Sequence, residues 1–353
     1  MNTLPPLRVG VVGLGFMAAT HIKAFRHLAS DIQVAALCSP SGRCLDGDFS
    51  KVSGNIGTQD PLKLDMTDVR TFRDFHQMLE DPTLDIIDIC APTWAHPDLA
   101  VAALQAGKHV VCEKPLSRTS ASAKQIVQVA RGARGIFMPA MCIRFWPEWA
   151  WLRSAIADGR YGRVLAARFR RVAEPPAWGH HHFGDGAKSG GGLLDLHIHD
   201  TDFVQFCFGP PAAVFSQGYT KFSGSIDHVT TQYFVECGAA IHAEGSWAMA
   251  KGFGFNMAFT VNFENATADY DIARGVDALK VSHEGQNQSI KPGGIDGYVN
   301  EFAHLVDSIR NGRPTSIVTA EDGWRAVHIC EAEERSIASK NIETLTYSDK
   351  EIA

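Results

Sequence analysis

The stretch Val9-Gly-Val-Val-Gly13-Leu-Gly15-Phe-Met-Ala18-Ala-Thr-His-Ile-Lys-Ala24 decides the fold. An apolar run of strand length is followed by a glycine-containing turn and then by a helical pattern. Gly13 permits a tight turn, Gly15 lets the backbone approach a pyrophosphate, and the small Ala18 allows close packing of helix on strand. A generic glycine-rich turn is the alternative, but the strand–turn–helix context favours a dinucleotide site with phosphates at the helix N-terminus. The residues assigned to this site are Gly13, Gly15, Phe16 and Met17.

The first 141 residues repeat this alternation of strand and helix. Strand-length apolar runs lie at Leu7–Val12, Gln33–Leu37, Ile86–Cys90, His109–Cys112 and Ile136–Met141, and helical patterns at Met17–Ala29, Thr71–Leu79, Pro97–Ala106 and Ala121–Arg131. Nearly continuous apolar strands between amphipathic helices are typical of a parallel sheet covered on both faces. We therefore predict an α/β protein with a doubly wound, Rossmann-type NAD(P)-binding domain over residues 1–141.

The pattern changes after Met141. Longer runs with partial period-2 alternation lie at Val164–Val172, Val214–Thr220, His228–Glu236, Ala239–Ala248, Asn256–Glu264 and Ala266–Asp271, and helical patterns at Pro147–Asp158, Leu193–Phe208, Tyr298–Arg310 and Thr319–Ala338. These patterns predict an α+β domain for substrate binding and oligomerisation over residues 142–353, built on a large, mostly antiparallel open sheet. A chain of 353 residues has room for about two such domains.

Composition narrows the range of partners. The 33 Lys+Arg against 39 Asp+Glu give a formal charge of −6, which gives no reason to expect nucleic acid or an anionic membrane surface. The apolar runs fall short of the ~20 residues that cross a bilayer. None of the eight cysteines forms a Cys-x-x-Cys pair, which favours reduced thiols in the cytoplasm over disulfides or a zinc knuckle. A small-molecule substrate is therefore expected.

The end of the second strand bears on the choice between NAD and NADP. An Asp or Glu that binds the ribose 2′-hydroxyl of NAD is expected there, but the sequence reads Cys38-Ser-Pro-Ser-Gly-Arg43. Ser39 and Arg43 are better suited to a 2′-phosphate. An ordinary turn with an exposed arginine explains the pattern nearly as well, so NAD(P) is predicted with a small preference for NADP.

Loops after two later strands should line the cofactor crevice. The fourth strand leads into Pro92, Thr93 and His96, although His96 would equally serve as a helix cap. The fifth strand ends in Glu113 and Lys114. A partly desolvated lysine at this place would polarise a reacting hydroxyl or carbonyl. Without that context it would be a solvated surface residue.

A glycine run introduces a helix that carries Asp195 and His199, four residues apart and thus on one face. A carboxylate beside an imidazole supports proton transfer near neutral pH, whereas from the helix alone a surface Asp–His pair is the simpler explanation. The run His180–His182 raises the question of a metal. Three consecutive histidines do not easily converge on one ion, and no cysteine or carboxylate spacing supports a site, so no metal is expected.

Taken in order, these motifs resemble the Gfo/Idh/MocA oxidoreductase family (glucose-fructose oxidoreductase, inositol dehydrogenase and rhizopine catabolism proteins). The resemblance covers nearly the whole chain, through Val9–Phe25, Asp85–His96, Glu113-Lys114-Pro115, Arg144–Pro147, Asp158–Val164, Gly191–His199, Tyr298–Ile309, Asn311–Pro314 and Thr319–Gly323. The combination of Glu-Lys-Pro with Asp-x-x-x-His is the specific part. Ala18 in place of a third glycine, and Ser39 where many members carry the ribose-binding Asp, depart from the pattern.

The resemblance implies a dehydrogenase that transfers a hydride between a nicotinamide cofactor and a hydroxyl or carbonyl carbon of a sugar, cyclitol or related polyol. It implies that Lys114 binds the reacting oxygen, that His199 exchanges the hydroxyl proton, and that Asp195 orients His199. Oxidation would then speed up as pH rises through the imidazole reference pKa of about 6.5. Candidate substrate contacts, from loop position alone, are Arg144, Trp178, His180, His181, His182 and Tyr298.

Two other functions stay open. A hydrolase that holds NAD permanently and cleaves a glycoside by transient oxidation would use the same fold. A non-catalytic regulator that senses a sugar or a dinucleotide would have no use for a proton-transfer trio. An exposed face of the large sheet would suit a homodimer or a homotetramer.

Overall fold

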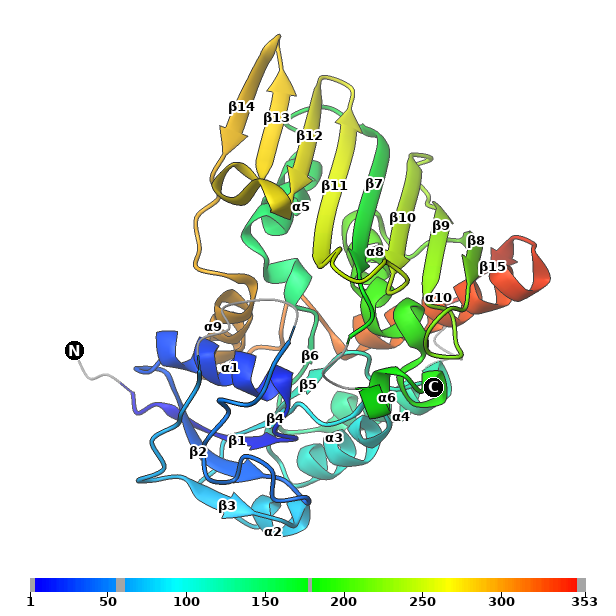
Figure 1. Ribbon diagram of the computed structural model, residues 1–353. Helices are drawn as coiled ribbons and strands as arrows, with labels where there is room; N and C mark the ends of the chain where they lie inside the picture. The colour runs from blue at the N-terminus through cyan, green and yellow to red at the C-terminus, as the bar shows by residue number, and fades with distance from the viewer. Residues whose placement is uncertain (1–3, 55–60, 177–179, 348–353) are drawn as a thin grey trace.

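The computed structural model describes residues 4–54, 61–176 and 180–347, which form two sheets with helices around and between them (Figure 1). The first sheet has six strands in the order β3-β2-β1-β4-β5-β6, and neighbouring strands pair in parallel. Its elements are β1 (Leu7–Val12), α1 (Phe16–His27), β2 (Ile32–Cys38), β3 (Arg70–Phe72), α2 (Phe75–Leu79), β4 (Ile86–Ile89), η1 (Thr93–Ala95), α3 (His96–Gln105), β5 (His109–Glu113), α4 (Ser120–Gly132) and β6 (Phe137–Ala140). The predicted doubly wound parallel sheet is confirmed.

The helix predicted over Thr71–Leu79 is wrong in its first half. Residues Arg70–Phe72 instead pair with β2 as the edge strand β3. The helix α2 begins only after Asp74, whose carboxylate accepts the Gln77 N–H at 3.1 Å and caps it. An N-cap aspartate starts a helix at a defined residue, and this signal outweighs the apolar periodicity that extends further back.

The second sheet has nine strands in the order β14-β13-β12-β11-β7-β10-β9-β8-β15. The pair β7–β10 is parallel, and the other neighbouring pairs are antiparallel. The strands are β7 (Val164–Ala173), β8 (Ala213–Tyr219), β9 (His228–Phe234), β10 (Ala240–Ser246), β11 (Phe255–Phe263), β12 (Ala266–Asp271), β13 (Leu279–His283), β14 (Gln286–Ile290) and β15 (Glu343–Thr344). The expected large, mostly antiparallel sheet is confirmed. The edge strand β14 was not predicted, because its polar, exposed Gln-Asn-Gln-Ser residues carry no apolar pattern.

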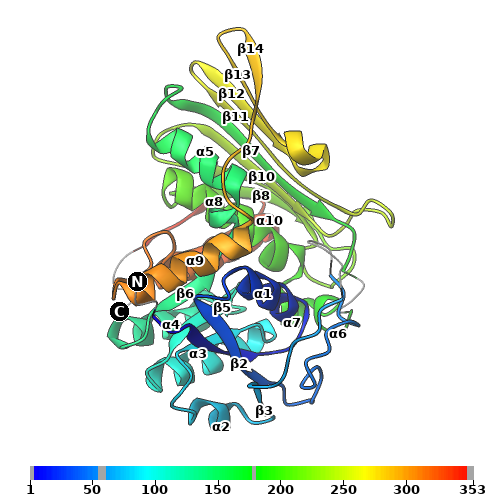
Figure 2. The ribbon, with the colours of Figure 1, turned by 90° about the vertical axis from the view of Figure 1, so that its left-hand side faces the viewer.

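The remaining helices follow β6 in the chain. They are η2 (Cys142–Phe145), α5 (Pro147–Ala157), α6 (His180–Phe183), α7 (Gly186–Ser189), η3 (Leu193–His197), α8 (Ile198–Phe208), η4 (Ile272–Asp277), α9 (Gly297–Arg310) and α10 (Ala320–Ser339). Figure 2 shows α5 and α8 on one face of the large sheet and α9 between the two sheets. Among the described helices, none is both long enough and apolar enough to span a membrane.

The last two helices pack back onto the first sheet's layer. Arg310 at the end of α9 forms an ion pair with Asp31 at 2.5 Å. Glu331 of α10 accepts the N–H of Ser120 at the start of α4 at 2.8 Å. The division of the chain at residues 141 and 142 stays a prediction, because these helices join both parts into one packed body.

The glycine turn between β1 and α1 can be tested at Gly13 and Gly15. Gly13 has a φ of +84°, and a Cβ there would lie 2.5 Å from the Ala91 backbone, whereas a Cβ on Gly15 meets nothing within 4 Å. We expect Gly13→Ala to lower the free energy of unfolding by about 1–3 kcal/mol from the backbone conformation alone, with the clash adding to it. Gly15→Ala should change it by less than about 0.5 kcal/mol. Equal losses in urea unfolding would contradict this account of the turn.

Candidate active site

The side chain of Lys114 bridges the two parts of the molecule. It follows β5, and its Nζ donates to the backbone carbonyl of Asp195 in η3 at 2.6 Å and lies 3.3 Å from the Asp195 Oδ1. The side chains are mostly buried, with exposed fractions of 12% for Lys114 and 18% for Asp195. The carboxyl end of β5 and the start of the helix that carries His199 therefore meet at one ammonium group.

His199 lies on the first turn of α8, directly after the π-helical turn η3. Burial lowers the pKa of its imidazole well below the usual value, and the positive charges of Lys114 and Arg171 lower it further. Its Nδ1 is buried and has no hydrogen-bond partner in the described part of the chain. The ring is therefore neutral at pH 7 and able to take a proton.

The predicted pairing of Asp195 with His199 is corrected. Lys114 rather than His199 contacts the Asp195 carboxylate. A hydrogen bond between two ionised groups is stronger than one to a neutral ring, and the low pKa of His199 keeps that ring neutral. Asp195 therefore holds the lysine, and the histidine is positioned by the helix itself.

Two buried ion pairs fix that helix. The Arg171 Nε donates to the Asp200 carboxylate at 2.8 Å. Arg144 donates from Nε and Nη2 to both oxygens of Asp202, at 2.8 and 2.7 Å. All four side chains are 3% exposed or less. Breaking a buried pair by removing one partner costs about 3–5 kcal/mol, so the two arginines hold the helix in one rotational setting.

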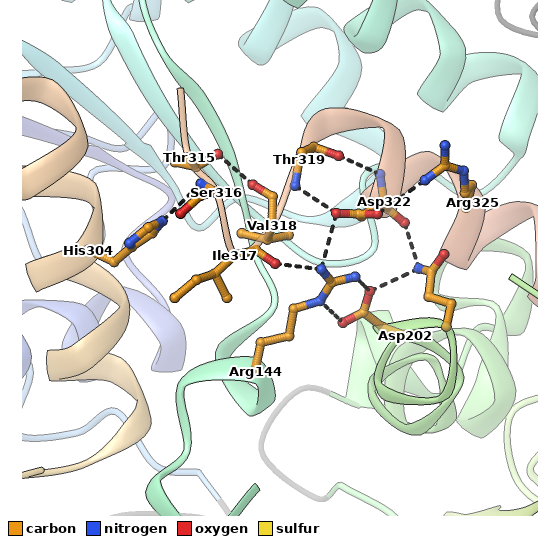
Figure 3. A network of polar contacts seen from close by, with 11 residues as sticks. Arg144, Asp202, His304, Thr315, Ser316, Ile317, Val318, Thr319, Asp322 and Arg325 are labelled. Atoms are coloured by element: carbon orange, nitrogen blue, oxygen red, sulfur yellow. Dashed lines mark hydrogen bonds and ion pairs between the residues drawn. The ribbon is translucent and has the colours of Figure 1, made fainter. Parts of the chain in front are cut away.

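The prediction that Arg144 contacts substrate is corrected, because its side chain is buried in contacts within the protein. Figure 3 shows its guanidinium also bound to the Ile317 carbonyl and to Asp322, the first-turn residue of α10. Four of its five N–H donors are thus directed at protein acceptors. The Arg-Phe-Trp-Pro motif signals a structural junction of η2, α8 and α10 at which substrate has no access.

A second buried cluster supports the other side of the helix. The Tyr233 hydroxyl lies 3.0 Å from the His197 Nε2 and 3.0 Å from the Thr201 hydroxyl, and it donates to Glu333 at 2.7 Å. His197 is fully buried. It is a structural residue, two positions before His199 in the sequence.

The remaining predicted substrate residues divide into three kinds. Tyr298 is a buried residue whose ring packs edge-on against Trp146, which corrects its assignment to substrate. Trp178 lies outside the described residues, as do the side chains of His180 and His181. His182 is described: burial lowers its pKa, and Asp195 and Lys114 both act on it electrostatically. The histidine run therefore does bring one imidazole to the site.

The glycine turn is built to hold a dinucleotide phosphate. Gly15 is the N-cap of α1, and within the described residues no side chain caps this helix and no acidic residue lies in its first turn. The space before Gly15 is open, since an added Cβ meets nothing within 4 Å. Backbone N–H groups at such an N-terminus attract anions. The residues present therefore fit the group that the fold implies.

The structure adds an arginine to the predicted 2′-phosphate residues. Ser39 is buried, with its hydroxyl 3.1 Å from that of Ser41, and Arg43 is exposed. Arg73 directly follows β3, and its guanidinium packs closely against Gly42. A Cβ added to Gly42 would lie 2.5 Å from the Arg73 Nη2. Sequence reasoning missed Arg73 because it lies 30 residues after Arg43, beyond a segment without a readable pattern.

The crevice loops are partly corrected. His96 is buried, with its ring nitrogens 2.8 and 2.7 Å from the carbonyls of Pro115 and Ala91. Both nitrogens are engaged by the backbone, so His96 ties the two loops together and has no atom left for a cofactor. Thr93 is buried, while Pro92 reaches the surface and stays a candidate. Trp94 in the same loop is 65% exposed, which the sequence alone does not show.

Comparisons with known proteins agree with the fold. A family model described as the oxidoreductase family with an NAD-binding Rossmann fold matches residues 7–141. The C-terminal domain model of the same family matches residues 149–269. The chain belongs to the Gfo/Idh/MocA oxidoreductase family.

Relatives of known activity share this family. The myo-inositol 2-dehydrogenase of Thermotoga maritima is 24% identical over 349 residues, 95% of this chain and 97% of that protein. The trans-1,2-dihydrobenzene-1,2-diol dehydrogenase of Bos taurus is 30% identical over 229 residues, 64% of this chain and 63% of that protein. A structure of levoglucosan dehydrogenase with NADH and levoglucosan superimposes with a TM-score of 0.81 over 97% of this chain and 99% of that chain, at 20% identity, which shows the shared fold.

His199 gives a pH test of the site. Because its pKa is lowered well below the ordinary value, kcat for oxidation should stay level from pH 7.5 down through about 6.5 and fall only at lower pH, as the ring becomes protonated. His199→Ala should lower kcat by about 10²–10⁴-fold. His27→Ala, at the exposed last residue of α1, is the control. A wild-type inflection at or above pH 6.5 that His199→Ala abolishes would contradict the assigned neutral state.

Proposed function

We propose that this chain is an NAD(P)-dependent dehydrogenase that interconverts a ring hydroxyl and a carbonyl on a sugar, cyclitol or related polyol. The observation that carries the proposal is the meeting of the Lys114 ammonium with Asp195 beside a neutral His199. A cation for the reacting oxygen and a base for its proton are the two groups that alcohol oxidation needs from the protein.

When bound, the nicotinamide ring supplies the hydride acceptor or donor. Lys114 has three N–H donors, of which two face Asp195, so one is left for the substrate oxygen. Its charge stabilises the negative charge that develops there as the hydroxyl loses its proton. His199 takes this proton in oxidation and returns it in reduction.

The turn Gly13-Leu-Gly15 and the N-terminus of α1, which carries Phe16 and Met17, would hold the cofactor phosphates. Pro92 and Trp94 would lie along the crevice, with the exposed indole offering an apolar face to a sugar ring. His182 would add a polar contact to a substrate hydroxyl. Relatives named for inositol and for a dihydrobenzene diol support a cyclic substrate with neighbouring hydroxyl groups.

We also propose that the enzyme works in the cytoplasm as a homo-oligomer, with no nucleic-acid or membrane partner. All eight cysteines are unpaired, which suits a reducing compartment. One face of the large sheet carries α5 and α8 (Figure 2), while alternate residues such as Thr230 and His242 of β9 and β10 reach the surface on the other. That second face would accept another copy of the chain.

A substrate panel tests the function. Inositols, aldoses and anhydrosugars are incubated with NAD and with NADP, and reduced cofactor is followed by absorbance. We expect turnover of a cyclic polyol that is lost in Lys114→Ala. Cleavage of a glycoside with no net change in cofactor absorbance would overturn the dehydrogenase in favour of the hydrolase, and binding without turnover of any member would favour a regulator.

Arg43 and Arg73 test the cofactor preference. If both face a 2′-phosphate, Arg43→Ala and Arg73→Ala should each weaken NADPH binding by about 1.5–3 kcal/mol, the scale of a hydrogen bond to a charged group. NADH binding, measured by the same fluorescence titration, should barely change. Tighter binding of NADH than of NADPH by the wild type would show that the preference for NADP is wrong.

A further inference from the structure

Ionisable side chains that the proposed reaction does not use are buried directly behind Lys114. His21 of α1 is fully buried, and its Nδ1 lies 3.0 Å from both oxygens of Asp88 in β4. Its Nε2 lies 3.1 Å from the Oε1 of Glu113, the last residue of β5. Asp88 is fully buried and Glu113 is 5% exposed. Three charged groups thus occupy a site that apolar residues of the same size would fill at lower cost.

The hydrogen bonds fix the charge of this group. Each ring nitrogen of His21 faces a carboxylate, so each must carry a hydrogen, and the ring is an imidazolium. Burial opposes this charge, but the interactions with Asp88 and Cys90 together raise the pKa of His21 well above its usual value. Cys90 also faces the ring, with its Sγ 3.3 Å from Nδ1; burial raises the pKa of its thiol, which stays neutral.

Helix α9 closes the cluster. Glu301 is fully buried, and neither of its carboxyl oxygens has a hydrogen-bond partner among the described residues. Burial and the nearby charges of Glu113 and Asp88 raise its pKa well above the usual value, so it is neutral. The ring of Phe302 packs edge-on against His21 at 4.8 Å. Water is therefore kept from the imidazolium, and Glu113 and Asp88 are its counter-ions.

The cluster connects to the active site through one residue. The second oxygen of Glu113, Oε2, accepts the backbone N–H of Lys114 at 3.1 Å. Lys114 in turn donates from Nζ to Asp195. Hydrogen bonds therefore link Asp88, His21 and Glu113 to the backbone of Lys114, and the Lys114 side chain reaches from there to the helix that carries His199.

We propose that His21 is a positioning residue for the reaction. It holds the Glu113 carboxylate in place, and this carboxylate fixes the backbone of Lys114 and so the reach of its ammonium group. Without the imidazolium, Glu113 is a buried carboxylate with no counter-ion. When it turns away from this apolar site, the Lys114 N–H loses its acceptor. The inference rests on the proposed role of Lys114.

Three substitutions separate positioning from packing. His21→Phe keeps the ring and its aromatic contacts but removes both N–H groups, and Glu113→Ala removes the acceptor. Glu113→Gln keeps an acceptor, because its amide oxygen can accept the Lys114 N–H as the Glu113 Oε2 does. His109→Gln is the matched control, since His109 starts the same strand and its Nδ1 accepts the Ile136 N–H at the end far from Lys114.

We expect His21→Phe and Glu113→Ala to lower kcat by about 10–100-fold, the cost of a misplacement near 1 Å, with KM and the cofactor Kd from fluorescence titration changed less than about twofold. Glu113→Gln should recover most of the kcat that Glu113→Ala loses. His109→Gln should lower only the melting temperature.

Wild-type kcat in folded His21→Phe would overturn the inference, as would a Glu113→Gln variant no better than Glu113→Ala. If His21→Phe does not fold, the two Glu113 variants decide alone. Full activity in Lys114→Ala would instead overturn the proposed function, so the two failures are distinguishable.

Discussion

The contact between Lys114 and Asp195 is the constraint on which the rest of the structure depends. It joins the carboxyl end of a parallel strand to a helix packed on a different sheet, residues that are 81 positions apart. A single ammonium group cannot hold two layers together by itself, since an ion pair with some exposure is worth about 1 kcal/mol or less. The layer that carries Lys114 and the layer that carries Asp195 must therefore each fix the position of their own residue.

In both layers, buried ion pairs fix the position of the residue that takes part in this contact. On the side of the helix, Arg171 with Asp200 and Arg144 with Asp202 fix its rotation. On the side of the strand, the imidazolium of His21 fixes Glu113 and through it Lys114. Buried ion pairs add little net stability compared with apolar packing, but their geometry is demanding. In this molecule the buried ion pairs fix the positions of side chains, and they do so at a cost in the free energy of unfolding.

The sequence predicts those parts of the structure that depend on local pattern. Leu7–Val12 is a strand as expected, because the apolar run and Gly13 define both its ends. Lys114 contacts Asp195, and its charge acts on His199, whereas the roles of the three residues stay a prediction. What the sequence does not reveal is which partner each polar residue finds: Arg144 points into the protein toward Asp202, and His96 bonds two carbonyls. These choices depend on contacts between segments far apart in the chain, and no local spacing encodes them. The sequence indicates Asp195 as a candidate site residue, but it does not indicate that Lys114 is its partner.

The same constraint sets the protonation state of the base. Lys114 is held near His199 because Asp195 binds it, and Arg171 is held near because Asp200 binds it. Both cations disfavour a third positive charge, which adds to the effect of burial on the pKa of His199. In oxidation the ring must be neutral to accept a proton, and it already is. In reduction it must first be protonated, and the lowered pKa makes that form rarer but a stronger acid. The residues that position the helix therefore also tune its histidine, and a substitution at Asp200 would alter geometry and proton affinity together.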